Sequence, residues 1–502
     1  MTGAAAPAAA DGDIADLAKG GRTNFFGFLL RLAARVPFLF IAGRLYGADA
    51  LGRFAFAILV IEFAAQLATL GMKRGLAQML SKGGRADNHI VWDALLLAGI
   101  ASLLATLLLF IFPQAMFPNS RIYGLERLIP LIVFAIAWSD ISLAALAYRH
   151  DVAATVRARA VVEPWTISIA AGALYFVTPR DGLILAYAIS LVAALIASLI
   201  PFIRAYGMPH GWRPQPRALS IVARRNVPLA AADAIEWGTR NIDRFILGLF
   251  FAPAIVGVYW VAQQIVTLPQ KLKTSFDPIL GPVITQNLEA GNKAAVARQV
   301  RQVGFWIIAA QAGIALSLAI PGEAVMGLAG PAFVGGTGVL AFLLAAEVVA
   351  AMAVVSEAAL VYVARHRNLM ISVATITLQV VLSFAFILGA RALGWPVRVQ
   401  AAGPAVALPI ALAFASIMKA RLLSQLLGAP VSGWRWALVW AAAAATLIGY
   451  AFVSLPDRYE WVELAVGVPL ILGSYGLVIW FKGFTHEDRV LFKMKGGEET
   501  TR

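Results

Sequence analysis

The stretch DAIEWGTRNIDRFILG, residues 233–248, places five charged side chains in an apolar run long enough to cross a bilayer. At about 100° per residue they share one helical face: Asp233, Glu236, Arg240, Asp243 and Arg244. A charge facing lipid at the bilayer centre costs roughly 2.5 to 3.5 kcal/mol or more. This face must therefore line a polar space inside the protein.

The rest of the chain is strongly apolar. Of 502 residues, 60% are apolar and 14% charged, against about 45 to 50% and 25% in soluble domains. Apolar runs of about 18 to 25 residues recur throughout, which predicts an all-α integral membrane protein with about 14 transmembrane helices. We place them at 23–45, 54–72, 90–112, 128–148, 160–177, 183–203, 227–250, 253–270, 303–321, 337–363, 369–390, 403–423, 434–455 and 461–481.

The distribution of basic residues predicts the orientation. The formal net charge is +14, and most of the 41 Lys and Arg residues fall in one set of alternate loops. Because translocation of short basic loops is disfavoured, these loops and both termini are expected in the cytoplasm. The basic excess thus reflects topology and membrane lipids, and no nucleic-acid partner is expected. Residues 1–22 contain no signal-peptide core and read as a flexible tail.

An internal repeat divides the chain. Shifting it by 205 residues aligns RVPFLFIAGRLYGADALGRFAFA, from Arg35, with RNIDRFILGLFFAPAIVGVYWVA, from Arg240, and six of 23 positions are identical. Six spans separate the copies, so the two lobes should be parallel and Arg35 and Arg240 should lie at matching depth. We predict a tail (1–22), an N-lobe (23–203), a cytoplasmic amphipathic linker (204–226), a C-lobe (227–424), a C-terminal helix pair (425–481) and a second tail (482–502).

Two spans supply candidate anion-binding residues. Asn24, Arg31 and Arg35 share a face of the first span, which contains no acidic partner for the arginines. In the seventh span Arg240 can pair with carboxylates on its own helix, and Arg244 follows one turn later. Guanidinium groups hold phosphate through bidentate bonds, so these residues could bind a phosphate-bearing group. Ion pairing that fixes helix packing is the alternative.

Intramembrane carboxylates are candidates for ion coupling or for lining the cavity. The set comprises Asp140, Asp233, Glu236, Asp243, Glu347 and Glu357, with Glu62 and Glu163 as further acidic positions. Each could instead pair with an arginine or be hydrated near an interface. About a dozen such charges facing lipid would cost roughly 30 kcal/mol, several times the stability of a domain, so a polar cavity must exist.

Enzyme chemistry has little support. There are no cysteines, the five histidines lack metal-ligand spacing, and no nucleotide-binding glycine motif is found. We therefore expect neither a cofactor nor a metal site, and a transporter rather than an enzyme.

Three segments carry a family resemblance: GRLYGADALGRFAFA (43–57), NIDRFILGLFFAPAIVGVYWVAQQI (241–265) and FDPILGPVITQ (276–286). With the overall organisation, they resemble the Wzx-type polysaccharide and oligosaccharide flippases of the multidrug/oligosaccharidyl-lipid/polysaccharide exporter superfamily. The resemblance implies a multi-pass protein of the bacterial inner membrane that moves undecaprenyl-diphosphate-linked oligosaccharide outward for O-antigen (lipopolysaccharide), capsule or exopolysaccharide assembly. Its implied partners are membrane lipids, a polysaccharide polymerase and chain-length machinery.

Three alternatives remain. A lipid II flippase of the same superfamily shares the fourteen spans and the cationic cavity. A multidrug or cation antiporter usually has twelve spans and anionic walls. The enzyme alternative, a polysaccharide polymerase or O-antigen ligase, usually has a long periplasmic loop, whereas the longest outer connections here are expected to be only some fifteen residues.

Overall fold

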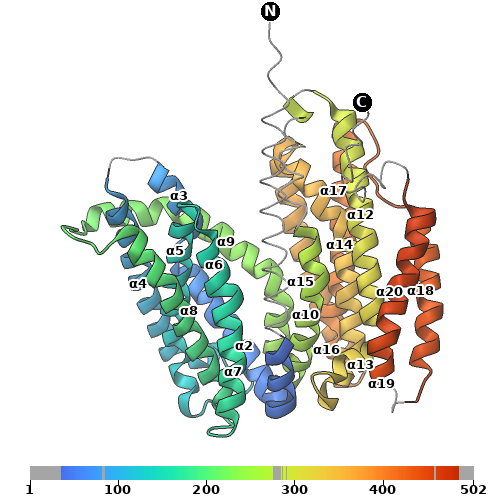
Figure 1. The fold of residues 1–502 in the computed structure, drawn as a ribbon, viewed down its shortest axis with the longest axis horizontal. Coiled ribbons are helices and arrows are strands. Elements are labelled where there is room, and N and C mark those ends of the chain that lie inside the picture. The colour runs from blue at the N-terminus through green and yellow to red at the C-terminus, as the bar shows by residue number, and fades with distance from the viewer. Residues whose placement is uncertain are drawn as a thin grey trace, which may run out of the picture. The chain divides into compact units, whose positions relative to one another are not determined.

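The computed structural model describes residues 36–81, 85–274, 284, 287–289, 291–456 and 460–485. Every regular element in these ranges is a helix, which confirms the predicted all-α fold. The chain forms two compact units, Met1–Trp260 and Val261–Arg502 (Figure 1). Helix α10 continues from the first unit into the second. The lobe boundaries proposed from the repeat, at 203 and 227, remain predictions.

Unit 1 is built from helices joined by short connections. They are η1 (Ala42–Tyr46), α2 (Gly47–Ala68), α3 (Met72–Ser81), α4 (Asp87–Ile111), η2 (Pro113–Ala115), η3 (Gly124–Leu131), α5 (Ile132–Tyr148), α6 (Val152–Val156), η4 (Arg157–Val162), α7 (Glu163–Tyr175), α8 (Gly182–Tyr206), α9 (Pro216–Phe250) and the start of α10 (Pro253–Thr274). Helix α8 packs against α5 and α7, and α2 packs against α5 and α9. Figure 1 shows α9 running obliquely to the bundle of α4, α5 and α8.

Unit 2 continues with a second set of helices. They are α12 (Lys293–Ala319), α13 (Gly322–Gly327), η5 (Pro331–Gly336), α14 (Thr337–Val363), α15 (Arg365–Ala392), α16 (Val397–Ala401), α17 (Gly403–Leu427), α18 (Ala437–Val453), α19 (Glu460–Val462), η7 (Glu463–Gly467), α20 (Val468–Val478) and η8 (Ile479–Gly483). Helix α17 packs against both α14 and α15. The C-terminal helices α18 and α20 pack against each other, side by side in Figure 1.

Helix length and apolar composition support a multi-pass membrane protein. Within the described ranges, nine helical segments are long and apolar enough to cross a membrane: Val36–Ser81, Asp87–Ile111, Gly124–Tyr148, Gly182–Tyr206, Lys293–Ala319, Pro331–Val363, Arg365–Ala392, Val397–Leu427 and Glu460–Gly483. Helix α4 shows the pattern clearly, because Leu103, Leu104, Leu107 and Leu108 are all more than half exposed. Such a surface suits lipid. The total of fourteen spans and the cytoplasmic termini remain predictions.

The charged stretch quoted above lies in α9, the longest helix described. Its 35 residues extend about 52 Å at 1.5 Å per residue, well beyond the roughly 30 Å of a hydrocarbon core. Proline at the start of the helix is favourable, because the first turn has no use for its missing N–H. One end of α9 must therefore extend beyond the apolar region or the helix must be strongly inclined to the membrane.

The repeated segments meet directly in the structure. A Cβ added to Gly52 on α2 would lie 1.7 Å from the carbonyl oxygen of Pro253 and 2.8 Å from the nitrogen of Gly257 on α10. A Cβ added to Gly257 would in turn lie 2.9 Å from the nitrogen of Gly52. These two glycines occupy equivalent positions of the 205-residue repeat. The contact is therefore reciprocal, and glycine permits the close approach of the two backbones.

We expect Gly52→Ala to destabilise the protein by about 1 to 3 kcal/mol, because the new methyl group cannot fit between α2 and α10. The thermal unfolding midpoint of the purified protein in detergent measures this. Gly238→Ala on α9 is the matched control, since among the described residues no heavy atom beyond the nearby backbone of α9 lies within 4 Å of the added Cβ. Equal unfolding midpoints for the two variants would contradict the proposed steric role of the glycine contact.

Candidate functional site

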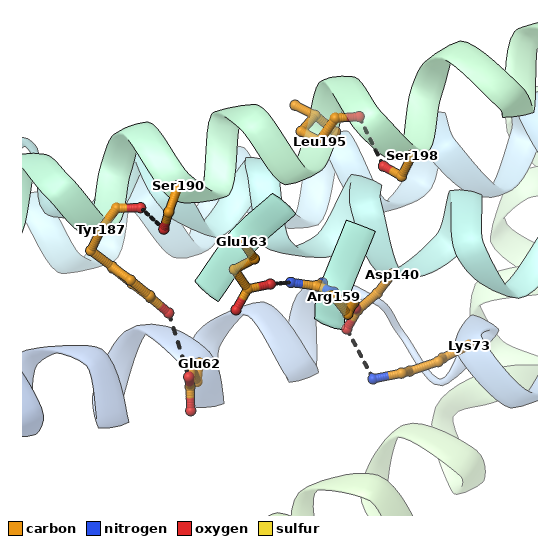
Figure 2. Close-up of polar contacts among 9 residues, drawn as sticks. All are labelled: Glu62, Lys73, Asp140, Arg159, Glu163, Tyr187, Ser190, Leu195 and Ser198. Carbon is orange, nitrogen blue, oxygen red and sulfur yellow. Dashed lines mark hydrogen bonds and ion pairs between the residues drawn. The ribbon is translucent and has the colours of Figure 1, made fainter. Parts of the chain in front are cut away.

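A cluster of charged side chains lies among the helices of unit 1. Its centre is Asp140 on α5, whose carboxylate accepts a hydrogen bond from Lys73 Nζ on α3 at 2.9 Å. The guanidinium of Arg159 on η4 donates to the other carboxylate oxygen. Figure 2 shows both basic side chains directed at Asp140 from different helices. An intramembrane carboxylate can remain ionised in such a site because each oxygen faces a cation.

Arg159 also connects the cluster to Glu163. Its NH1 donates to Glu163 Oε2 at 2.7 Å, at i,i+4 spacing. Arg159 lies in the π-helical segment Arg157–Val162, which ends two residues before Pro164. Proline has no N–H to donate to the carbonyl four residues earlier, which favours a locally widened helix at this position. The cluster thus combines two cations with two carboxylates and is formally neutral.

A second polar contact lies beside this cluster. The hydroxyl of Tyr187 on α8 donates to Glu62 Oε1 on α2 at 3.4 Å. The nearby serines of α8 do not join the network, since Ser190 and Ser198 donate to the carbonyls of Tyr187 and Leu195 on their own helix (Figure 2). Glu62 and Glu163, predicted only as further acidic positions, therefore both lie in the polar interior of unit 1.

The predicted cationic site can be examined only in part. Asn24, Arg31 and Arg35 lie outside the described residues, as does the side chain of Glu236. Arg240 is exposed on α9. Arg244 is half-buried and its guanidinium donates to Asn241 Oδ1, while its buried Nε–H has no hydrogen-bond acceptor among the described residues. The pairing of Arg35 with Arg240 in one site remains a prediction.

The other candidate carboxylates in unit 1 are held by specific partners. Asp243 accepts hydrogen bonds from the hydroxyl of Tyr259 at 2.7 Å and from the backbone nitrogen of Arg244 at 2.8 Å. The first bond joins α9 to α10. Asp233 is almost fully buried and pairs with Arg74 Nε on α3 at 2.9 Å. Both contacts favour a role in positioning α9 within unit 1.

In unit 2, Glu347 and Glu357 lie on the same helix, α14. Glu347 accepts a hydrogen bond from Gln270 Nε2 on α10 at 3.4 Å. Glu357 pairs with the buried Lys419 of α17 at 2.8 Å, and the Lys419 ammonium also donates to Ser372 Oγ at 3.1 Å. Among the described residues, no group of three or more His, Cys, Asp or Glu side chains could hold a metal ion.

Several partner residues were not predicted from the sequence. Lys73, Arg74 and Arg159 lie in loops of the predicted topology, and Lys419 lies in the twelfth predicted span, but the structure pairs all four side chains with carboxylates. Long basic side chains can extend several ångströms from a helix end, so position along the chain does not locate the charged group. Only the i,i+4 spacing of Arg159 and Glu163 was a usable signal.

The chain is similar to a family model and to solved transporters. A model described as "Polysaccharide biosynthesis protein" matches residues 41–318. The structure of a lipid II flippase, MurJ, in an inward closed conformation matches with a TM-score of 0.67 and 13% identity, over 91% of this chain and 97% of that one. None of the curated protein sequences compared with the chain matches significantly.

Two further structures have the same fold at low identity. An inward-facing multidrug resistance MATE transporter of the MOP superfamily matches with a TM-score of 0.60 and 14% identity, covering 79% of this chain and 95% of that one. A MOP superfamily transporter from Pyrococcus furiosus matches with a TM-score of 0.51 and 13% identity, covering 79% and 96%. The matched proteins are transporters and not enzymes, and this chain has the same fold as they do.

We expect Asp140→Asn to destabilise the protein by about 3 kcal/mol or more, because the change leaves the Arg159 charge with one carboxylate instead of two. Glu163→Gln should destabilise the protein less, since Arg159 keeps its ion pair with Asp140 and the Glu163 side chain is more exposed than that of Asp140. Ser198→Ala is the control and should change stability by less than about 0.5 kcal/mol. Thermal unfolding in detergent ranks the stability of the three variants. A larger loss of stability in Glu163→Gln than in Asp140→Asn would refute the central position of Asp140.

Proposed function

Since the chain belongs to the polysaccharide biosynthesis protein family, we propose that it is a flippase for undecaprenyl-diphosphate-linked oligosaccharide. It moves this lipid from the cytoplasmic to the outer leaflet of the bacterial inner membrane, for O-antigen, capsule or exopolysaccharide assembly. The family match over residues 41–318 carries the proposal. The transporter fold supports it.

Alternating access is the proposed mechanism. In the inward-open state the diphosphate of the cargo binds Arg31, Arg35 and Arg240, the sugars occupy the hydrated cavity, and the polyprenyl tail stays in lipid. Guanidinium groups suit this role because they remain charged and bind phosphate oxygens in pairs. The exposure of Arg240 and the buried Nε–H of Arg244, which lacks an acceptor, are compatible with an anionic ligand beside α9.

An ion gradient or the membrane potential supplies the energy in this mechanism, with one or more of the intramembrane carboxylates carrying the coupling ion. Moving one elementary charge through 100 mV provides about 2.3 kcal/mol. The ion pairs of Asp140, Asp233 and Glu357 support a positioning role for these carboxylates in this proposal. A polysaccharide polymerase and chain-length proteins are the proposed functional partners.

The double substitution Arg35→Ala with Arg240→Ala should abolish or strongly reduce restoration of surface polysaccharide in a strain that lacks the gene. The physical reason is loss of two guanidinium groups that bind the diphosphate. Surface polysaccharide is measured together with the amount of inserted protein. Arg121→Ala, which changes an exposed loop arginine, is the control. Full restoration by the double variant at normal protein levels would rule out the proposed anion site.

A leaflet-resolved transport assay distinguishes the possible cargoes. Purified protein in vesicles is supplied with either an undecaprenyl-diphosphate oligosaccharide or lipid II, with and without an imposed ion gradient. The proposal expects transfer of the first lipid, with stimulation by the gradient. Transfer of lipid II alone would identify the chain as a lipid II flippase, and cation efflux without lipid transfer would identify an antiporter.

A further inference from the structure

Helix α3 holds two different helices through two consecutive residues. Lys73 pairs with Asp140 of α5 at 2.9 Å, and Arg74 pairs with Asp233 of α9 at 2.9 Å. Adjacent residues of a helix point about 100° apart, so one short helix can serve both partners. Both basic side chains are about half exposed, whereas the carboxylates are 14% and 2% exposed. Each of the two carboxylates thus has a cationic partner on α3, and Asp140 has a second one in Arg159 of η4.

Helix α9 also rests directly on the start of α3. A Cβ added to Gly71 would lie 2.5 Å from the backbone nitrogen of Ala230 and 2.8 Å from the Cβ of Leu229. A Cβ added to Gly75 would lie 2.1 Å from Asn226 Oδ1. The two glycines therefore form a surface, here called the α9 seat, that any larger side chain would block. The Arg74–Asp233 ion pair holds α9 on this seat.

The ten-residue α3 is a helical segment distinct from α2. It is separated from α2 by a turn in which Leu70 and Gly71 both have positive φ, at 49° and 68°. Met72, Leu76 and Leu80 anchor its other face in the apolar core of unit 1. Since Lys73 and Arg74 are consecutive residues of one short helix, both ion pairs depend on the position of α3.

We propose that α3 couples the charge cluster around Asp140 to the position of α9. While Lys73 pairs with Asp140, α3 keeps its position and Arg74 keeps α9 on the α9 seat. Loss of the Lys73–Asp140 pair releases α3, weakens the Arg74–Asp233 pair and frees this part of α9. Because α9 leads into α10, which continues into unit 2, the released segment is the covalent route to the second unit.

The coupling itself does not require the proposed flippase function. Only its role in transport rests on that function. In alternating access, a change of charge in the cluster, by a coupling ion or by an anionic headgroup competing for Lys73, becomes a movement of α9. Lys73 and Arg74 are positioning residues in this scheme. A ligand can shift such an equilibrium only through different affinity for the seated and released states.

Cysteine labelling tests the coupling without transport. The chain contains no cysteine, so a single Leu229→Cys substitution supplies the only thiol. This thiol lies on α9, beside Gly71 of the α9 seat. Its reaction rate with a water-soluble maleimide is measured in the purified protein. We expect Arg74→Gln and Lys73→Gln each to raise this rate by roughly tenfold. This corresponds to a loss of about 1.4 kcal/mol of the free energy that keeps α9 on the α9 seat. The effect of Lys73→Gln is decisive, because its ion-pair partner lies on α5 and not on α9.

Matched variants separate coupling from general loosening. Lys73→Arg preserves the charge and should keep the parent rate, and exchanging the charges in Arg74→Asp with Asp233→Arg should largely restore it. Arg85→Gln removes another ion pair, with Asp93 of α4, and should leave the rate unchanged. An unchanged rate in Lys73→Gln beside an increased rate in Arg74→Gln would overturn the proposal. The labelling needs no cargo, so its outcome is independent of whether lipid transfer is observed.

Discussion

An ionised side chain within a membrane-spanning helix needs an opposite charge, because neither lipid nor a dry protein interior can replace its hydration. In unit 1 this constraint determines which helices must stay together. Asp140 holds α5 to both α3 and η4, Asp233 holds α9 to α3, and Asp243 holds α9 to α10 through Tyr259. Apolar packing brings the helices together, but it specifies their mutual register less strictly than these pairs.

The local backbone allows these pairs to form. The π-helical turn before Pro164 places Arg159 where it can reach Asp140 and Glu163 together. The positive-φ turn at Leu70 and Gly71 starts α3 in a new direction, which lets Lys73 and Arg74 face separate helices. Two of the helix irregularities of unit 1 thus lie beside these charged pairs.

The apolar runs were sufficient to predict an all-helical membrane protein, because bilayer thickness sets a length that few soluble helices match. Asp233 and Asp243 of the α9 stretch are buried, and the polar space that their helix face is expected to line remains a prediction. Their partners could not be predicted in the same way. Lys73 and Arg74 lie at the start of α3, where basic residues also determine topology, and only the folded arrangement shows which carboxylate each one reaches. Asn24, Arg31 and Arg35 lie outside the described residues and remain predictions.

The internal repeat has a geometric consequence beyond the alignment. Gly52 and Gly257 are equivalent residues that touch reciprocally, each approaching the other's backbone nitrogen. Equivalent residues can contact each other in this way only close to the axis that relates the two copies, as at a symmetric dimer interface. The glycine contact joins α2 to α10, whereas the Arg74–Asp233 pair joins α3 to α9, so the two contacts hold different pairs of helices in unit 1.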